Sequence, residues 1–130
     1  MDRVLQEDLV DCINKVEKEL GNHYKENIYQ NALSVELNIR GYLIQTEVIV
    51  PIFYNNVYVG FERADIVIYN KQGIIMTVLE LKSQSARISS KEINQLKKYL
   101  KNLKCNTGIL VNFYEHLEKV KVSADHHEKI

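Results

Sequence analysis

The chain has 130 residues, of which 45% are hydrophobic and 26% are charged, with five glycines and one proline. This composition is typical of a globular domain and excludes a disordered or low-complexity chain. Because 17 Lys and Arg balance 17 Asp and Glu, no overall field draws the chain toward nucleic acid, and any such binding needs a local patch.

Length and the lack of linker-like segments predict one domain over residues 1–122, followed by a polar tail over 123–130. No apolar run approaches the length of a transmembrane helix, and the first residues fit neither a signal peptide nor a transit peptide. We therefore expect an intracellular, cytoplasmic protein. Cys12 and Cys105 lack CxxC spacing and have apolar neighbours, which favours reduced structural thiols.

Two amphipathic helices are predicted at the start of the chain. Apolar residues over 5–20 recur at spacings of three and four, and Gly21 ends this pattern. A second helical pattern begins near Lys25 and ends at Gly41. Glu26 stands in its first turn, where the helix dipole favours an acid by about 0.3–1 kcal/mol, and local evidence supports only that role.

From residue 44 the apolar pattern becomes alternating or continuous, which predicts strands over 44–54, 57–69 and 74–81. Asn55 and Asn56 tolerate positive φ and predict a tight turn between the first two strands. The single proline, in the first strand, indicates a bulge or an edge position. The three strands form an antiparallel meander.

Charged residues interrupt this meander. Arg63 and Asp65 continue one face of the second strand, and Glu80 and Lys82 share a face of the third, roughly 6–7 Å apart. Adjacent strands lie roughly 4.8 Å apart, so Asp65 and Glu80 can face each other at a separation that suits a shared metal ion. Burying charges is costly unless they meet one another, a metal or a ligand, so the cluster predicts chemistry.

A third helix is predicted over residues 89–103, where Ser89 and Glu92 have the spacing of a capping box. Gln95 and Tyr99 lie beside its apolar stripe. Its exposed side carries Lys97, Lys98, Lys101 and Lys104, for which a solvated face is the alternative role. Residues 107–113 predict a buried strand, 117–122 an edge strand or helical turn, and the chain from Ser123 is expected to fray. His126 and His127 are discounted as a metal site because a pair near a terminus is more often incidental.

The order of elements, with Asp65, Glu80, Lys82 and Gln95 placed on them, resembles the PD-(D/E)XK nuclease superfamily. In that superfamily an Asp ends or bends one strand, a Glu-x-Lys lies on the next, and a Gln or similar group follows on a flanking helix. The resemblance implies an α/β (α+β) fold with a restriction-endonuclease-like core, in which a mixed central sheet with an antiparallel three-strand meander is flanked by helices.

A narrower resemblance is to the GxxExxY proteins, a small prokaryote-type family within that superfamily. It rests on residues 21–29 and on further stretches, which are Ala32-Leu33, Glu36-Leu37, Arg63-Ala64-Asp65, Glu80-Leu81-Lys82, Gln95-Leu96 with Tyr99-Leu100, and 108–113. The chain has His23 where the name-giving Gly belongs, so the turn into the second helix is expected to differ. We expect a capping or surface role for His23 rather than that of a ligand or base.

The superfamily resemblance implies Mg²⁺-assisted or Mn²⁺-assisted hydrolysis of phosphodiester bonds, by an endonuclease or exonuclease acting on DNA rather than RNA. Asp65, Glu80 and the backbone carbonyl of Leu81 would hold the cation, with Glu26 as a further ligand through water. Lys82 would orient the attacking water and offset charge on the phosphate.

Gln95 would position the water or Lys82. Possible substrate contacts come from one arginine, one tyrosine and the lysine-rich helix face: Arg63, Tyr99, Lys97, Lys98 and Lys101. A salt bridge for Arg63 and core packing for Tyr99 are equal competitors of this role.

Two other interpretations stay open. The charges over residues 63–82 could form a structural ion-pair cluster without catalysis, or the chain could be an inactive nuclease-fold module for nucleic-acid binding or protein assembly. A homodimer could pair two sites for two strands of nucleic acid.

Overall fold

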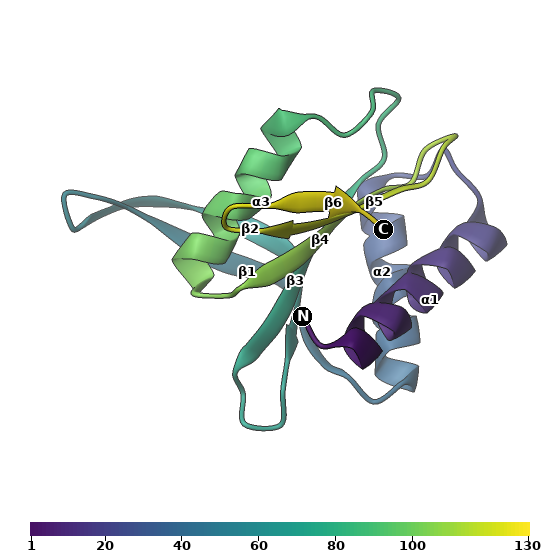
Figure 1. The fold of residues 1–130 in the computed structure, drawn as a ribbon, viewed down its shortest axis with the longest axis horizontal. Helices are drawn as coiled ribbons and strands as arrows, with labels where there is room; N and C mark the ends of the chain where they lie inside the picture. The colour runs from purple at the N-terminus through teal and green to yellow at the C-terminus, as the bar shows by residue number, and fades with distance from the viewer.

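The computed structural model describes all residues 1–130 and contains three helices and six strands. In chain order these are α1 (Arg3–Leu20), α2 (Glu26–Ile39), β1 (Leu43–Tyr54), β2 (Val57–Tyr69), β3 (Ile75–Lys82), α3 (Ser90–Leu103), β4 (Thr107–Asn112), β5 (Glu118–Ser123) and β6 (His127–Lys129). All strands join one sheet in the order β1-β2-β3-β4-β5-β6 (Figure 1). Only β3 and β4 run parallel, so the predicted α/β fold with a mixed sheet and an antiparallel meander is confirmed.

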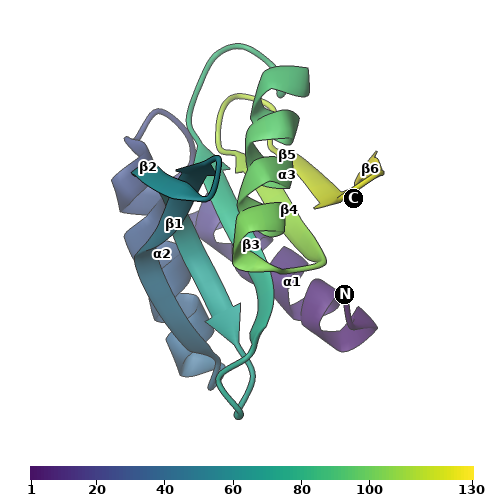
Figure 2. The ribbon, with the colours of Figure 1, turned by 90° about the vertical axis from the view of Figure 1, so that its left-hand side faces the viewer.

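The helices lie on both faces of the sheet, with α1 and α2 on one and α3 on the other (Figure 2). A parallel strand pair needs a crossover connection, and α3 provides it between β3 and β4. One apolar core lies under α1 and α2, around Leu9, Ile13 and Leu33, and the second lies under α3, around Leu96 and Leu100. None of the three helices is long and apolar enough to cross a membrane.

A close approach between α3 and the sheet depends on Gly108. This residue pairs with Val78 across the parallel strands. A Cβ at position 108 would lie 2.8 Å from the carbonyl oxygen of Val78 and 3.2 Å from the side chain of Leu96. Glycine therefore lets the middle of α3 lie directly on β4.

The β1–β2 hairpin extends beyond the rest of the sheet as an arm, seen on the left of Figure 1. Asn55 and Asn56 have φ angles of 48° and 63°, which confirms the tight turn at its tip. Pro51 lies in β1, an edge strand, next to an irregularity in register between Ile52 and Phe53, so both expectations for the proline are met.

The alternation of side chains along β2 breaks at Asp65. Ala64 and Val67 contribute to the core under α3, whereas Ile66, between them, contributes to the core under α1 and α2. Glu47 stands opposite Asp65 in the register and has a φ of 53°, in the left-handed region. The prediction of one continuous face along β2 is therefore wrong, because local bends on both strands exchange the two faces at this point.

The C-terminal residues do not fray. β6 pairs antiparallel with β5, and the Ile130 N–H donates to the Lys119 carbonyl over 2.9 Å. The turn between the strands is closed by the Ser123 N–H, which donates to the carbonyl of His126 over 2.8 Å. The prediction that the chain frays from Ser123 is therefore wrong. Main-chain hydrogen bonds hold this segment in place although its side chains are exposed.

Candidate active site

The candidate site lies where β2 and β3 separate. Their backbone pairing ends at Ile66 and Leu79, and the next two opposed positions are Asp65 and Glu80. The Asp65 N–H donates to Glu80 Oε1 over 2.8 Å, and the Leu81 N–H donates to Asp65 Oδ2 over 2.7 Å. Side chains thus replace the missing ladder bonds, and the structure places the two carboxylates opposite each other across the hairpin.

Burial and mutual repulsion disfavour ionisation of this pair. Glu80 is 4% exposed, and burial, followed by the charge of Asp65, raises the pKa of Glu80 to about 8. Burial is also the main cause that raises the pKa of Asp65 to about 6, with the charges of Glu26 and Glu47 adding to it. Without a bound cation, the site therefore favours the protonated forms of these two carboxyl groups.

None of the ion pairs in the structure includes Arg63, Asp65, Glu80 or Lys82. This finding argues against the alternative of a structural ion-pair cluster. Lys82 acts on the carboxylates only as a nearby positive charge, which lowers the pKa of each by less than burial raises it.

Lys82 and Gln95 meet beside the carboxylates. The Lys82 ammonium group donates to Gln95 Oε1 over 3.2 Å, which links β3 to α3. Both side chains line a polar pocket of about 280 Å³ together with Gln84, Lys91 and Glu92. Neither Lys82 nor Lys91 has a carboxylate within ion-pair distance, because the Glu92 carboxylate in the same pocket is bound by Ser89 and Gln84.

A network around Asn112 holds the loop that follows Lys82. Asn112 is 1% exposed, and its side-chain amide donates to the carbonyls of Gln84 and Ala86 and accepts from the Gln84 N–H. Glu118 accepts from the Ile88 N–H over 3.1 Å. These bonds fix the loop between β3 and α3, and with it one wall of the polar pocket.

The start of α2 is tied to the end of β3. Ser83 Oγ donates to the carbonyl of Tyr24 over 2.6 Å. Tyr29 is fully buried, stacks on Phe113 at 4.3 Å, and donates its hydroxyl to the carbonyl of Gly21 over 2.7 Å. The tyrosine thereby anchors the turn that leads into α2.

Glu26 lies exposed at the first position of α2, and its charge raises the pKa of both Asp65 and Glu80. No group of three or more His, Cys, Asp or Glu side chains converges closely enough to hold a metal ion. Glu26 is therefore a neighbour of the carboxylate pair but does not join it in one cluster.

His23 lies on the surface of the turn before α2. Its ring makes an edge contact with Tyr114, with ring centres 5.2 Å apart. Its φ of 78° is in the left-handed region that favours glycine. The turn thus adopts a glycine-like conformation despite the histidine.

The expected substrate contacts do not gather at the pair. The guanidinium of Arg63 lies 5.5 Å from the ring centre of Phe61, and Tyr99 is buried with its hydroxyl donating to Glu62 over 3.3 Å. The lysines Lys97, Lys98 and Lys101 line a different pocket, of about 330 Å³, on α3. Tyr99 therefore has the core packing that competes with a substrate role, whereas Arg63 stacks on an aromatic ring and forms no salt bridge.

Sequence patterns missed Glu47, Gln84 and Lys91. Counting the register from the Asn55–Asn56 turn puts residue 46 opposite Asp65, and the irregularity near Phe53 shifts that position to Glu47. Gln84 and Lys91 lie at the two ends of a loop that has no helical or strand periodicity, so the sequence does not predict which way their side chains point.

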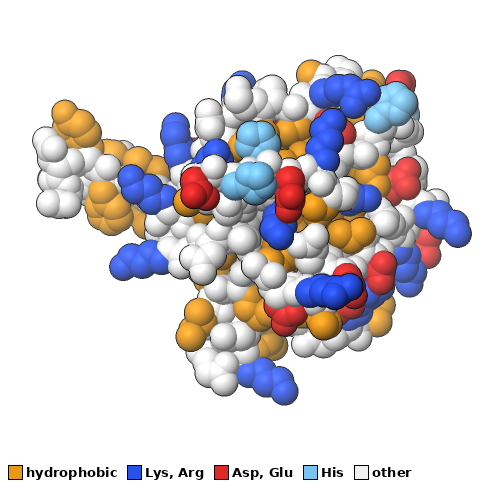
Figure 3. Space-filling view, viewed as in Figure 1, with side chains coloured by type: hydrophobic (Ala, Val, Ile, Leu, Met, Phe, Trp, Pro, Cys, Tyr) orange, Lys and Arg blue, Asp and Glu red, His pale blue; other side chains and the backbone are white.

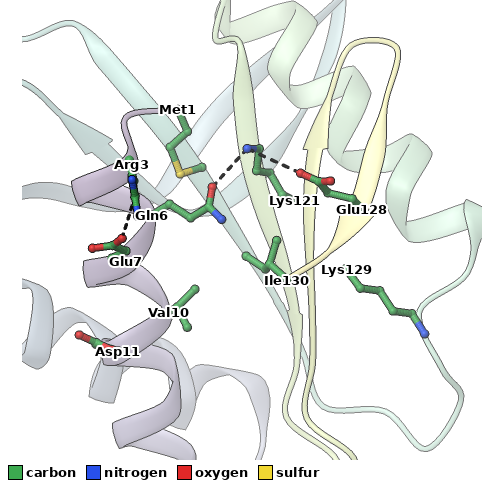
Figure 4. A pocket seen from close by; sticks show the side chains of 10 residues that line it. All are labelled: Met1, Arg3, Gln6, Glu7, Val10, Asp11, Lys121, Glu128, Lys129 and Ile130. Atoms are coloured by element: carbon green, nitrogen blue, oxygen red, sulfur yellow. Dashed lines mark hydrogen bonds and ion pairs between the residues drawn. The ribbon is translucent and has the colours of Figure 1, made fainter.

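A larger pocket of about 730 Å³ lies between α1 and the β5–β6 hairpin (Figure 4). Its charges are mostly paired with one another, as Arg3 with Glu7 and Lys121 with Glu128. None of the candidate site residues lines this pocket, so the volume of a pocket does not identify the active site in this protein.

Comparison with known proteins agrees with the fold. A model of the PD-(D/E)XK nuclease superfamily matches residues 3–123. The match spans nearly the whole chain, which therefore belongs to the PD-(D/E)XK nuclease superfamily. A search of curated proteins gives no match.

Among solved structures, the crystal structure of SSO0001 is similar, with a TM-score of 0.51 and 24% identity. The similarity covers 89% of this chain, which spans 65% of the length of SSO0001. At this identity the comparison shows a shared fold, which agrees with the restriction-endonuclease-like architecture expected from the sequence.

Proposed function

We propose that the chain is a metal-dependent nuclease that hydrolyses phosphodiester bonds of nucleic acid, with DNA as the substrate rather than RNA. The observation that carries this proposal is the buried Asp65–Glu80 pair, which lacks an ion-pair partner and lies beside Lys82 and Gln95. We also propose membership of the GxxExxY proteins, supported by the role of Tyr29 in anchoring the turn before Glu26.

The donor set fits a hard divalent cation such as Mg²⁺ or Mn²⁺. Asp65 and Glu80 each use one oxygen in a hydrogen bond to the backbone and keep the other free. With the carbonyl of Leu81 they offer oxygen ligands only, which is what Mg²⁺ prefers. A cation there would also offset the repulsion that raises both pKa values. Glu26 would reach the cation through water.

Each residue of the site has a separate role in the proposed reaction. A bound Mg²⁺ would polarise the phosphate and lower the pKa of a water molecule. Lys82 would orient the attacking water and stabilise charge that develops on the phosphate oxygens. Gln95 would hold the Lys82 ammonium group in place from α3 through their 3.2 Å hydrogen bond.

The polar pocket around Lys82 and Lys91 is a suitable place for a backbone phosphate, because both ammonium groups are free of carboxylate partners. Further contacts with nucleic acid are assigned to Arg63, Lys97, Lys98 and Lys101, whereas the buried Tyr99 is left with a packing role. A homodimer would bring two such sites to the two strands of a duplex.

Single-turnover cleavage of labelled DNA and RNA with Mg²⁺ or Mn²⁺ tests the proposal. Lys82→Met keeps most of the aliphatic stem and should slow cleavage by about 10²–10³-fold with little loss of stability. Asp65→Asn should weaken metal binding, so its defect should shrink as the metal concentration rises. Lys71→Met, at an exposed turn, is the matched control and should cleave like the wild type.

A stable wild type that is inert with every metal and substrate would favour the second candidate, an inactive nuclease-fold module for binding or assembly. The observation in favour of that candidate is that only two carboxylates converge. A strongly destabilised but fully active Lys82→Met variant would contradict the role of Lys82.

A further inference from the structure

The arm formed by residues 49–63 exposes apolar side chains that nothing in the fold covers. On β1 and β2, Ile49, Phe53, Tyr58 and Phe61 are between 47% and 59% exposed. The protrusion on the left of Figure 3 shows hydrophobic side chains along its length. The largest exposed apolar patch of a soluble protein is often a functional surface.

These side chains share one face of the arm. Phe53 lies opposite Tyr58 with ring centres 6.1 Å apart, and Pro51 lies opposite Phe61. At the base of the same face, Arg63 stacks on Phe61. We call Ile49, Pro51, Phe53, Tyr58 and Phe61 the apolar face.

The other side of the arm is different. Val50 and Ala64 there belong to the core under α3, and Glu62 binds the hydroxyl of Tyr99. On that side Tyr54 and Val57, near the tip, are largely exposed, and Glu62 is the exposed residue nearer the base. The apolar face is therefore the uncovered side of the arm along its whole length.

The lack of charge over residues 49–61, above Arg63 at the base of the arm, argues against nucleic acid as the occupant of the apolar face. Residues 49–61 contain no charged side chain, whereas duplex and single-stranded nucleic acids are both held through Lys and Arg contacts to phosphates. A membrane is also a poor occupant, because the tip that would enter it first consists of the polar residues Asn55 and Asn56. An uncharged, flat face of aromatic and aliphatic side chains instead suits a copy of itself.

Contact through the strand edge is hindered. β1 is the edge strand, but Pro51 lacks an N–H and the bend at Glu47 disturbs the edge below it. The face, not the edge, is thus the available surface for a second copy.

We propose that two copies of the chain form a homodimer by packing their apolar faces together, with the arms antiparallel about a two-fold axis. In this orientation the tip of each arm reaches the base of the other. A parallel orientation would instead bring the two Arg63 side chains together, with like charges facing each other.

The base of the arm offers a matching surface for the tip. A groove of about 740 Å³ runs between α2 and β1, lined by residues that include Ser34, Asn38, Gln45 and Thr46. Its hydroxyl and amide groups suit the polar side chains of Asn55 and Asn56. Residue Ile49 lies both on the apolar face and in this groove, so the two surfaces are continuous.

The area is sufficient for a small specific interface. With about 150–250 Å² for each aromatic side chain, the apolar face exposes on the order of 400–450 Å² per copy. Adding the tip in the groove brings the total for two copies to about 1,200 Å², the lower end of specific interfaces. The proposal concerns assembly and does not depend on cleavage activity.

Sedimentation velocity of the full chain over a wide range of concentration tests this assignment. The wild type should dimerise, and Phe53→Glu should raise the dissociation constant at least ~30-fold, because each copy then places a carboxylate in an apolar contact. Tyr58→Glu is a second variant with the same expectation. Val4→Glu is the matched control, because Val4 is 63% exposed on α1, outside both the apolar face and the groove, and the dissociation constant of this variant should stay within about threefold of the wild-type value.

Circular dichroism melts of all four proteins establish that each is folded, as expected for substitutions at exposed positions. A wild type that stays monomeric at the highest concentration overturns the proposal, as does a dimer equally sensitive or equally insensitive to Phe53→Glu and Val4→Glu. Monomers that bind lipid vesicles or labelled single-stranded DNA through Phe53 would assign the face to that other occupant and overturn it as well.

Discussion

The β1–β2 hairpin consists of two regions that meet at Glu47 and Asp65. In the half that lies in the sheet, the carboxylate of Glu80 is buried against β2 without an ion-pair partner. In the half that forms the arm, aromatic side chains such as Phe53 are exposed to solvent. Both halves depart from the usual distribution of side chains, in opposite directions.

The difference teaches how one strand pair can carry two unrelated surfaces. The bends at Glu47 and Asp65 exchange the two faces of the hairpin, so the apolar face of the arm and the carboxylate pair point to different sides of the sheet. The buried carboxylate in the first half lacks a positively charged partner, and the exposed aromatic side chains in the second half lack an apolar surface packed against them. If this comparison is right, ionisation of the buried Glu80 should destabilise the fold, whereas replacement of an exposed side chain on the arm should cost little.

The largest effect is expected from Glu80→Gln in metal-free protein. The pKa of Glu80 in the folded state is about 8, above its ordinary value of 4.5. Between these values the folded protein keeps a proton that the unfolded chain has released, so the free energy of unfolding should fall as the pH rises. The side chain of the Glu80→Gln variant does not ionise, so this loss of stability is absent from it. The variant should therefore be more stable than the wild type above pH 8, by a few kcal/mol.

Thermal melts at several pH values in the presence of EDTA measure this difference. Mg²⁺ added at pH 8 should stabilise the wild type and leave the variant almost unchanged. A fall in stability of equal size in both proteins would show that Glu80 is not the source.

A smaller effect is expected from Asn112→Ala. The substitution removes hydrogen bonds to Gln84 and Ala86 from a buried site, which typically costs about 2–3 kcal/mol. Cleavage should also slow, because the loop after Lys82 loses its support. Urea denaturation measures the loss in the free energy of unfolding. The control is Asn106→Ala, at an exposed position. Equal stability of the two variants would mean that the network contributes nothing.

The smallest effect is expected on the arm. Tyr54 is 70% exposed on the side away from the apolar face, so Tyr54→Ser should change the free energy of unfolding by less than about 0.5 kcal/mol. Urea denaturation at low protein concentration checks this. A cost above 2 kcal/mol would mean that the arm is packed in solution, and the contrast with the sheet would disappear.

Much of the fold followed from local patterns. Amphipathic spacing located α1, α2 and α3, and the Asn55–Asn56 turn located the first hairpin. The short turn over residues 70–73, together with the alternating strands on either side of it, placed Asp65 opposite Glu80. These features depend on short-range chemistry, which the sequence displays directly.

The features that sequence reasoning missed depend on tertiary contacts. The place of Glu47 follows from bends that no residue type signals, and β6 is held by main-chain bonds rather than by an apolar pattern. Lys91 faces Lys82 only because α3 docks across β3 and β4. Likewise, an alternating hairpin predicts two faces but not that one of them lacks a covering helix.

The absence of a side chain at Gly108 has a consequence for how the site can be tuned. Leu96 touches the space above Gly108, and the residue before it on α3 is Gln95, which holds Lys82. The volume of residue 108 therefore sets the height of the helix above the sheet and, through it, the separation of Lys82 and Gln95. A side chain at this position would also press on the Val78 carbonyl of β3, so a change at residue 108 would shift both elements that carry Lys82 and Gln95 without replacing either residue.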